Sequence, residues 1–237
     1  MMLSISPTKK EAIHSIALHI VSLAKKNIAE KNAFTLVLSG GQTPEELYKL
    51  LAAPPFNEAV NWSKVFFFFG DERFVPPTDE ESNYRMAAAT LLTPLQIPPE
   101  QIFFIDTAVA INKAAELYQQ KLKSFFGNSE MSFDLILLGL GENLHVASLF
   151  PHTAILHDTE PAVKAVKTDD KNAYRITMNA PLINKAKCIY FLVSGKNKAS
   201  AIRQALKGPI DTDAFPVQLI KTPRVHWFID KDAGTGL

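Results

Sequence analysis

The first candidate for acid–base chemistry in this sequence is His145. It follows the apolar run 133–138 and a glycine-rich turn that contains Gly139 and Gly141. Histidine titrates near neutral pH, so its side chain can take a proton from water. An isolated histidine is more often structural than catalytic. This one comes directly after a predicted buried strand, where ligands bind in open parallel sheets, and that position favours a catalytic role.

A pair of glycines follows another apolar run, 33–38, in the motif Ser39-Gly40-Gly41-Gln42-Thr43-Pro44. Glycines let main-chain amides approach an anion closely, and the start of the following helix adds free N–H groups. Thr43, Pro44 and Glu46 also fit a capping box with proline at the first helical position. The capping box explains part of the motif but not the glycine pair, so we predict a phosphate-binding loop here.

Charged residues follow or lie in other predicted strands. They are Asp71 and Arg73 after the run 64–69, Arg175 in the run 174–178, and Lys198 after the run 186–193. A cation is unfavourable at a helix N-terminus, so Lys198 makes more sense there if it shares an anion with that terminus. These residues could also have purely structural roles. Residues 71–73 could form an internal ion pair, Ser82 could be a helix N-cap, and Lys198 could be a solvated surface lysine.

These candidates depend on strands and helices that bring them to one edge of a sheet. Short apolar runs, typical of strands covered on both faces, alternate with segments of helical periodicity. We predict strands at 33–38, 64–69, 101–105, 133–138, 174–178, 186–193 and 225–229, and helices at 8–29, 44–51, 83–92, 109–126 and 197–206. The alternation predicts one α/β domain over residues 1–237, doubly wound and Rossmann-like, with a mostly parallel sheet and helices on both faces.

Composition and charge exclude several classes of function. The chain is 47% hydrophobic and 21% charged, with a formal net charge of +1 and scattered lysines and arginines. We therefore expect no nucleic-acid partner. No apolar stretch approaches the roughly 20 residues that span a bilayer, so no membrane partner is expected. The single cysteine, Cys188, cannot form an internal disulfide, which favours a reducing, cytoplasmic location.

The sequence also predicts neither a metal nor a cofactor. His145 and His152 have a spacing that fits no common zinc pattern. The Gly139-Leu140-Gly141 turn lacks the third glycine of a dinucleotide-binding motif, and no acidic residue lies at a convincing offset in a following strand. We therefore do not expect NAD.

Taken together and in this order, the motifs resemble the 6-phosphogluconolactonase family, within the wider group of glucosamine-6-phosphate deaminase and ribose-5-phosphate isomerase-like folds. The segments that carry the resemblance are 39–44, 71–73, 82–84, 139–151, 175–177 and 194–198. The run Ala147-Ser148-Leu149-Phe150-Pro151 matches the lactonases, whereas the deaminases carry Ala-Phe-Asn-Glu in this place.

One departure from the family pattern lies beside the histidine. The family reads Asp-Gly-His-Thr, whereas this chain has Asn143-Leu144-His145-Val146. Asn143 can supply a hydrogen bond to His145 but not a negative charge. If the family's glycine adopts a positive φ, then Leu144 is strained at this position or the loop differs.

The resemblance implies hydrolysis of 6-phosphoglucono-1,5-lactone to 6-phosphogluconate in the oxidative pentose phosphate pathway. It implies a small sugar-phosphate substrate, no cofactor, and a monomer or small homo-oligomer. In this interpretation His145 is the general base beside Asn143, and Asp71 either orients substrate hydroxyls or holds Arg73, which contacts polar groups of the substrate. The residues expected to hold the phosphate are Arg175, Lys198 and the loop with Ser39, Gly40, Gly41 and Thr43.

Two other functions are open at this point. An isomerase or deaminase of an amino-sugar phosphate would use Asp71 to abstract a carbon-bound proton, and it would release ammonia from glucosamine 6-phosphate. A non-catalytic sugar-phosphate-binding protein is suggested by the altered Asn143-Leu144 segment. It would bind 6-phosphogluconate without turning over the lactone.

Overall fold

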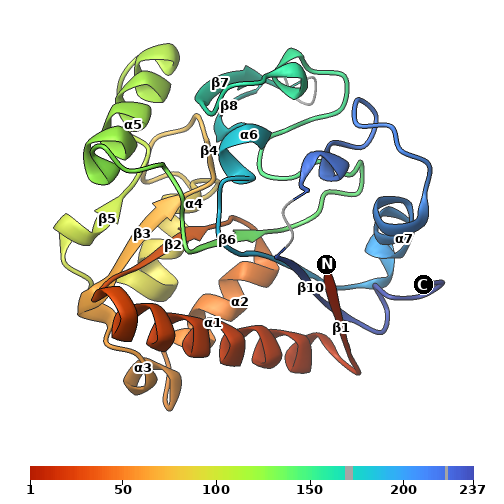
Figure 1. Ribbon diagram of the computed structural model, residues 1–237, viewed down its shortest axis with the longest axis horizontal. Coiled ribbons are helices and arrows are strands. Elements are labelled where there is room, and N and C mark those ends of the chain that lie inside the picture. The colour runs from red at the N-terminus through yellow and green to blue at the C-terminus, as the bar shows by residue number, and fades with distance from the viewer. Residues whose placement is uncertain (169–172, 222–223) are drawn as a thin grey trace.

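A computed structural model, which describes residues 1–168, 173–221 and 224–237, contains a central sheet of seven parallel strands (Figure 1). The strands are β1 (Met2–Ser6), β2 (Phe34–Leu38), β3 (Val65–Phe69), β5 (Ile102–Phe103), β6 (Leu135–Leu138), β9 (Ile189–Val193) and β10 (Val225–Asp230). Their order in the sheet is β1-β10-β9-β6-β2-β3-β5, and each neighbouring pair is parallel. The predicted fold class is thereby confirmed.

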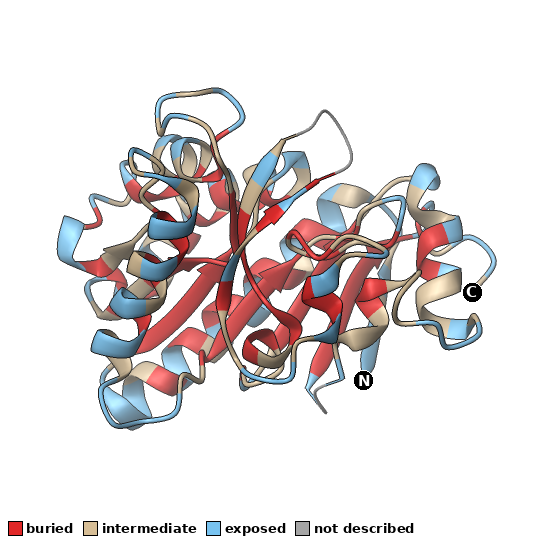
Figure 2. Ribbon diagram, turned by 90° about the horizontal axis from the view of Figure 1, so that it is seen from above, coloured by how far each residue is buried: buried red, intermediate tan, exposed pale blue. Residues whose placement is uncertain are grey.

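Helices cover both faces of this sheet. The helices are α1 (Lys9–Lys31), α2 (Gln42–Leu51), α3 (Phe56–Ala59), α4 (Asn83–Ala87), α5 (Ile111–Phe126), α6 (Ala180–Ile183) and α7 (Ala199–Lys207). In Figure 1, α1, α2 and α3 lie on one side of the sheet, and α5 and α6 lie on the other. Because both faces are covered, the central strands β2, β6 and β9 are buried along their whole length, as Figure 2 shows.

The helical periodicity of the N-terminal segment predicts its packing well. The buried residues of α1 recur at spacings of three and four, from Ala12 to Ala24, so one stripe of the helix faces the sheet. Thr8 is the N-cap, and its side chain accepts a hydrogen bond from the Glu11 amide at 3.2 Å. Asn32 ends the helix in the left-handed conformation, with φ of 59°.

The direction in which strands are added reverses between β2 and β6. From β2 the chain proceeds outward through β3 to β5, and it then returns to place β6 on the other side of β2. At such a reversal the connections leave the sheet on opposite faces, so a crevice opens at the carboxyl ends of the two strands. The segments that follow β2 and β6 are those with the Gly40-Gly41 pair and His145.

A second, antiparallel sheet of three strands lies beside this edge. It consists of β4 (Asp71–Arg73), β8 (Tyr174–Met178) and β7 (Val163–Lys167), in the order β4-β8-β7. The predicted strand 174–178 is thus confirmed as a strand, but it belongs to this small sheet and not to the parallel one. Ile176, Thr177 and Met178 are fully buried, whereas Tyr174 is exposed. The small sheet extends the site beyond the parallel strands.

The predicted capping box at Thr43 is wrong. Helix α2 begins two residues earlier than predicted, at Gln42, with Gly41 as N-cap at φ 105° and no side-chain cap. The Thr43 hydroxyl instead contacts the Ser194 hydroxyl at 3.2 Å, and Glu46 pairs with Lys9 at 2.6 Å. Since glycine adopts this positive φ without strain, the helix starts at the glycine and needs no hydroxyl cap.

Candidate active site

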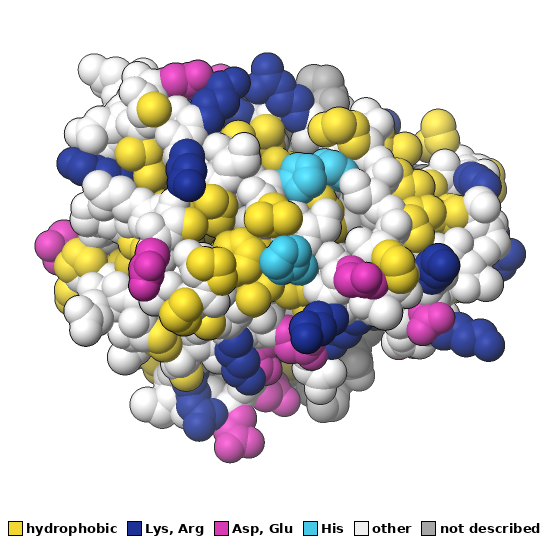
Figure 3. Space-filling model, turned by 90° about the horizontal axis from the view of Figure 1, so that it is seen from below, with side chains coloured by type: hydrophobic (Ala, Val, Ile, Leu, Met, Phe, Trp, Pro, Cys, Tyr) yellow, Lys and Arg dark blue, Asp and Glu magenta, His cyan; other side chains and the backbone are white. Residues whose placement is uncertain are grey.

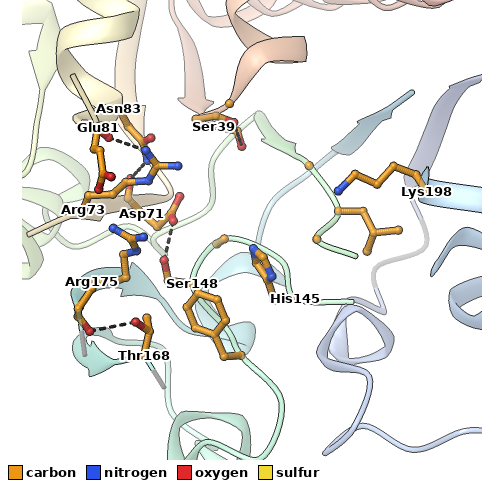
Figure 4. A pocket seen from close by; sticks show the side chains of 18 residues that line it. Ser39, Asp71, Arg73, Glu81, Asn83, His145, Ser148, Thr168, Arg175 and Lys198 are labelled. Atoms are coloured by element: carbon orange, nitrogen blue, oxygen red, sulfur yellow. Dashed lines mark hydrogen bonds between the residues drawn. The ribbon is translucent and has the colours of Figure 1, made fainter. Parts of the chain in front are cut away.

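A cavity of about 390 Å³ lies at the carboxyl ends of β2, β3, β6 and β9, where the sequence places its motifs (Figure 4). Eight of the ten predicted site residues line it: Ser39, Gly40, Gly41, Asp71, Arg73, His145, Arg175 and Lys198. The lining does not include Thr43, whose hydroxyl turns to Ser194, or Asn143, which lies behind His145. The structure therefore brings together residues from five separate segments of the chain.

His145 is held in one orientation by Asn143. The Asn143 Oδ1 atom lies 2.5 Å from His145 Nδ1 and 3.4 Å from the His145 main-chain nitrogen. A main-chain N–H can only donate, so the amide atom facing it is the acceptor oxygen. That oxygen can pair with Nδ1 only if Nδ1 carries the hydrogen. The Nε2 atom of the neutral ring is then left with a free lone pair.

The surroundings of His145 favour its neutral form. Burial lowers the pKa of the imidazole, and the positive charges of Lys198, Arg175 and Arg73 lower it further, while Asp71 opposes this change. The ring also packs on Phe150, with ring centroids 4.6 Å apart. A neutral, oriented imidazole at pH 7 can accept a proton.

Leu144 adopts a positive φ. This is the conformation expected if the family's glycine has a positive φ at this position. Its φ is 63°, in the region where a residue with a branched side chain is strained. The residue is buried, and its carbonyl accepts a hydrogen bond from the Val217 amide at 3.1 Å. Packing and this hydrogen bond therefore keep a non-glycine residue in a glycine conformation directly before His145.

Asp71 faces the cavity without pairing to an arginine. Its Oδ2 atom accepts a hydrogen bond from the Ser148 hydroxyl at 2.6 Å, as Figure 4 shows. Arg73 instead donates from Nη1 to the Glu81 carbonyl. Of the two roles predicted for Asp71, orientation of substrate hydroxyls therefore agrees with the geometry better than a hold on Arg73.

Glu72, between these two residues, has a structural task. Its carboxylate accepts hydrogen bonds from the amides of Arg73, Asn83 and Tyr84 at 2.7–2.8 Å, and from the Ser82 hydroxyl at 3.1 Å. It thereby satisfies the free amides at the start of α4, where Ser82 is the N-cap. The predicted helix N-cap at Ser82 is confirmed, and the carboxylate that fixes this loop binds amides and not a cation.

Two arginines and one lysine supply positive charge. Arg73 and Arg175 are directly opposite each other on β4 and β8. Burial and the neighbouring Arg73 lower the pKa of Arg175, yet an arginine stays charged at neutral pH. Lys198 ends a short helical turn, Lys196–Lys198, directly before α7. In Figure 4, Lys198 approaches from the side opposite Arg175, with His145 between them.

Close packing requires glycine at two cavity positions. A Cβ atom on Gly40 would lie 1.9 Å from Asn83 Oδ1, and one on Gly141 would lie 2.1 Å from His145 Nδ1. Gly40 is therefore required by the side chain of Asn83, independently of any phosphate that its loop binds. Gly141 is required by the imidazole itself.

Sequence reasoning missed several residues of the lining. Glu81, Asn83, Ser148, Phe150 and Thr168 line the cavity as well. Ser148 and Phe150 lie within the segment 139–151, but nothing in the sequence pattern distinguishes them from their apolar neighbours there. Ser148 bonds to β4 and β8 of the small antiparallel sheet, which the periodicity does not predict beyond residues 174–178, and Phe150 packs on the ring of His145.

Other classes of site receive no support from the described residues. Among them, no group of three or more His, Cys, Asp or Glu side chains is placed to hold a metal ion. No described helix is long and apolar enough to cross a membrane. On the face shown in Figure 3, basic and acidic side chains are interspersed among apolar ones.

Comparison with known proteins gives consistent matches over nearly the whole chain. A family model described as glucosamine-6-phosphate isomerases/6-phosphogluconolactonase matches residues 7–227. A 6-phosphogluconolactonase of Haemophilus influenzae is 35% identical over 229 residues, which cover 96% of each chain. One of Synechocystis sp. is 37% identical over 217 residues, which cover 90% of this chain and 88% of that protein. The structure of 6-phosphogluconolactonase from Trypanosoma cruzi superimposes with a TM-score of 0.89 at 26% identity, covering 100% of this chain and 96% of that one.

Proposed function

This chain belongs to the glucosamine-6-phosphate isomerase/6-phosphogluconolactonase family, and we propose that it hydrolyses 6-phosphoglucono-1,5-lactone to 6-phosphogluconate. The observation that carries the proposal is the imidazole of His145, which Asn143 orients beside a cavity whose described lining includes three cations. Ester hydrolysis needs a base for water, and a phosphorylated substrate needs positive charge.

His145 is the general base in this mechanism. Its Nε2 takes a proton from a water molecule while the water oxygen attacks the lactone carbonyl carbon. The tetrahedral intermediate then expels the ring oxygen as the bond between it and the carbonyl carbon breaks. The imidazolium returns the proton to that oxygen, and the product is the open-chain acid. General-base assistance of this kind contributes a factor on the order of 10²–10⁴ to the rate.

The phosphate is held by groups at the rim of the cavity. Arg175 and Lys198 approach from opposite sides, and Gly40 and Gly41 bring main-chain amides and the N-terminus of α2 to the same cavity. A helix N-terminus and a guanidinium both favour a phosphate dianion. Among the described residues, the lining contains three cations with Arg73 and two carboxylates, Asp71 and Glu81, so these residues favour an anionic substrate electrostatically.

The remaining polar groups bind the sugar. Asp71 accepts hydrogen bonds from substrate hydroxyls, and Arg73 donates to substrate oxygens. Thr43, which points toward Ser194, contributes its main chain near the start of α2 and not its hydroxyl. A cytoplasmic location and a monomeric or small oligomeric state stay predictions from the sequence.

The direct test is turnover of freshly generated 6-phosphoglucono-1,5-lactone, corrected for spontaneous hydrolysis, with glucosamine 6-phosphate as the comparison substrate. We expect enzyme-dependent loss of the lactone and no release of ammonia. Loss of lactone no faster than the blank, with 6-phosphogluconate still raising the thermal midpoint, would identify a binding protein instead. Ammonia release would identify a deaminase.

A further inference from the structure

Ser148 fixes the carboxylate of Asp71 within the cavity. The residue is 1% exposed, and its hydroxyl donates to Asp71 Oδ2 at 2.6 Å. Hydrogen bonds to an ionised carboxylate are short and roughly twice as strong as neutral ones. Within residues 1–168, 173–221 and 224–237, no lysine, arginine or histidine forms an ion pair with Asp71. The direction of this carboxylate is therefore set by a hydroxyl and not by a cation.

Ser148 is itself attached to the small sheet. Its main-chain N–H donates to Thr177 Oγ1 at 3.2 Å, and the Thr177 hydroxyl donates to the Met178 carbonyl at 3.0 Å. Thr177 is also the residue directly opposite Asp71 in the β4–β8 pair. The segment that carries His145, three residues earlier, is thus joined to β4 through the side chain of Ser148 and to the adjacent strand β8 through its main chain.

The turn around Ser148 gives this attachment a fixed geometry. The Leu149 amide donates to the Val146 carbonyl at 2.9 Å, and Ala147 adopts a φ of 48°. A turn closed in this way leaves the chain few alternative paths between His145 and Ser148. The contacts of Ser148 therefore determine the distance between His145 and the Asp71 carboxylate. Ser148 need not touch the substrate to have this effect.

We propose that Ser148 is a positioning residue of the lactonase reaction. Its hydroxyl occupies Oδ2 of Asp71 and leaves Oδ1 to accept hydrogen bonds from substrate hydroxyls. Its main chain holds the His145 segment at a constant separation from that carboxylate. This inference rests on the proposed function, because it assigns Asp71 to substrate orientation within that reaction.

A double-mutant cycle tests this inference. Ser148→Ala should lower turnover roughly 10- to 100-fold, the effect of losing a hydrogen bond to a charged group, with a smaller effect on the Michaelis constant. In an Asp71→Asn background the same change should cost less than about twofold, because the carboxylate through which Ser148 acts has been removed. An equal fold-loss in both backgrounds would show that Ser148 acts independently of Asp71 and would overturn the inference.

The affinity for 6-phosphogluconate is measured for the same four proteins. The double-mutant cycle then gives a result even if Asp71→Asn has no measurable turnover. Ser132→Ala is the matched control, because its hydroxyl donates to the Lys185 carbonyl at 2.7 Å outside the cavity, and it should leave turnover unchanged. If Ser148→Ala does not fold, Ser148→Cys, which keeps a weaker donor of similar size, replaces it. Absence of turnover in the unmodified protein would contradict the proposed function, while the binding cycle still decides the role of Ser148.

Discussion

At the scale of single residues, the pair of Asn143 and His145 distinguishes this site. An amide oxygen fixes the tautomer of the imidazole at 2.5 Å but adds no charge, whereas an aspartate in its place would stabilise the imidazolium. The base therefore keeps its lone pair at lower pH. The cost is that the imidazolium formed during the reaction is stabilised less.

The first prediction concerns the pH dependence of turnover. Burial, and then the neighbouring cations, lower the pKa of His145 from its ordinary value, so the acid limb of kcat/KM should have its midpoint at a lower pH than an unperturbed histidine would give. Asn143→Asp adds a negative charge beside the ring, which raises the pKa and should move this limb upward by about one unit or more. Profiles for the two proteins measure the shift. An identical midpoint in both would contradict the assignment of His145 as the titrating base.

The second prediction concerns the phosphate. Arg175→Ala should raise the Michaelis constant for the lactone at least tenfold, since a charged, half-buried hydrogen-bond donor to the phosphate is lost. Steady-state kinetics on the lactone measure the change. Arg203→Ala, outside the cavity lining, is the control. Unchanged kinetic constants for Arg175→Ala would remove this residue from the phosphate site.

At the scale of elements, the site depends on close contact between turns. Gly141 lies against the ring of His145, and its Cβ position is 2.1 Å from Nδ1 and 2.8 Å from Asn143 Oδ1. An added methyl group must therefore displace either the base or the residue that orients it.

The third prediction follows from this contact. Gly141→Ala should lower kcat by about tenfold to a hundredfold, because misplacement of a catalytic group by about 1 Å has an effect of this size. The thermal midpoint should change little, because Gly141 does not have a positive φ. Gly70→Ala is the control, since its added Cβ would meet Val37 at an ordinary 3.5 Å. Full activity of Gly141→Ala would show that the ring is not confined by this turn.

Sequence patterns predict the central elements because these carry strong periodic signals. The apolar runs at β2, β3, β6, β9 and β10 give the parallel sheet and the edge on which the motifs lie. Three other strands have no such signal. β4 consists of Asp71, Glu72 and Arg73, β1 pairs with a strand more than two hundred residues later, and β7 mixes lysines with its valines. The side chains of Ser148 and Asn83 both bond to Asp71 on β4, so their roles could not be predicted from spacing.

At the scale of the whole molecule, Asp134 joins the N-terminal half to the centre of the sheet. Its carboxylate is fully buried and accepts hydrogen bonds from the Thr35 amide at 2.9 Å, the Thr35 hydroxyl at 3.0 Å and Lys31 Nζ at 2.5 Å. Asp134 precedes β6, whereas His145 follows it, so the two lie at opposite ends of the same strand.

The fourth prediction separates stability from catalysis. Asp134→Ala leaves the Thr35 amide and hydroxyl without their acceptor, so the free energy of unfolding should fall by about 3 kcal/mol. The thermal midpoint should fall by roughly 6–12 °C. Turnover at 25 °C should be unchanged. Asp232→Ala, at an exposed position near the C-terminus, should alter neither quantity. A large loss of kcat in folded Asp134→Ala protein would show that the two ends of β6 are coupled.

We propose that His145 activates water for hydrolysis of the lactone. The most direct measurement compares His145→Ala with the unmodified protein in the lactone assay, after circular dichroism and the thermal midpoint have shown that the variant is folded. We predict a loss in kcat of about 10²–10⁴-fold with the affinity for 6-phosphogluconate largely retained. Full turnover by the folded variant would show that His145 is not the base and that the base lies elsewhere in the cavity.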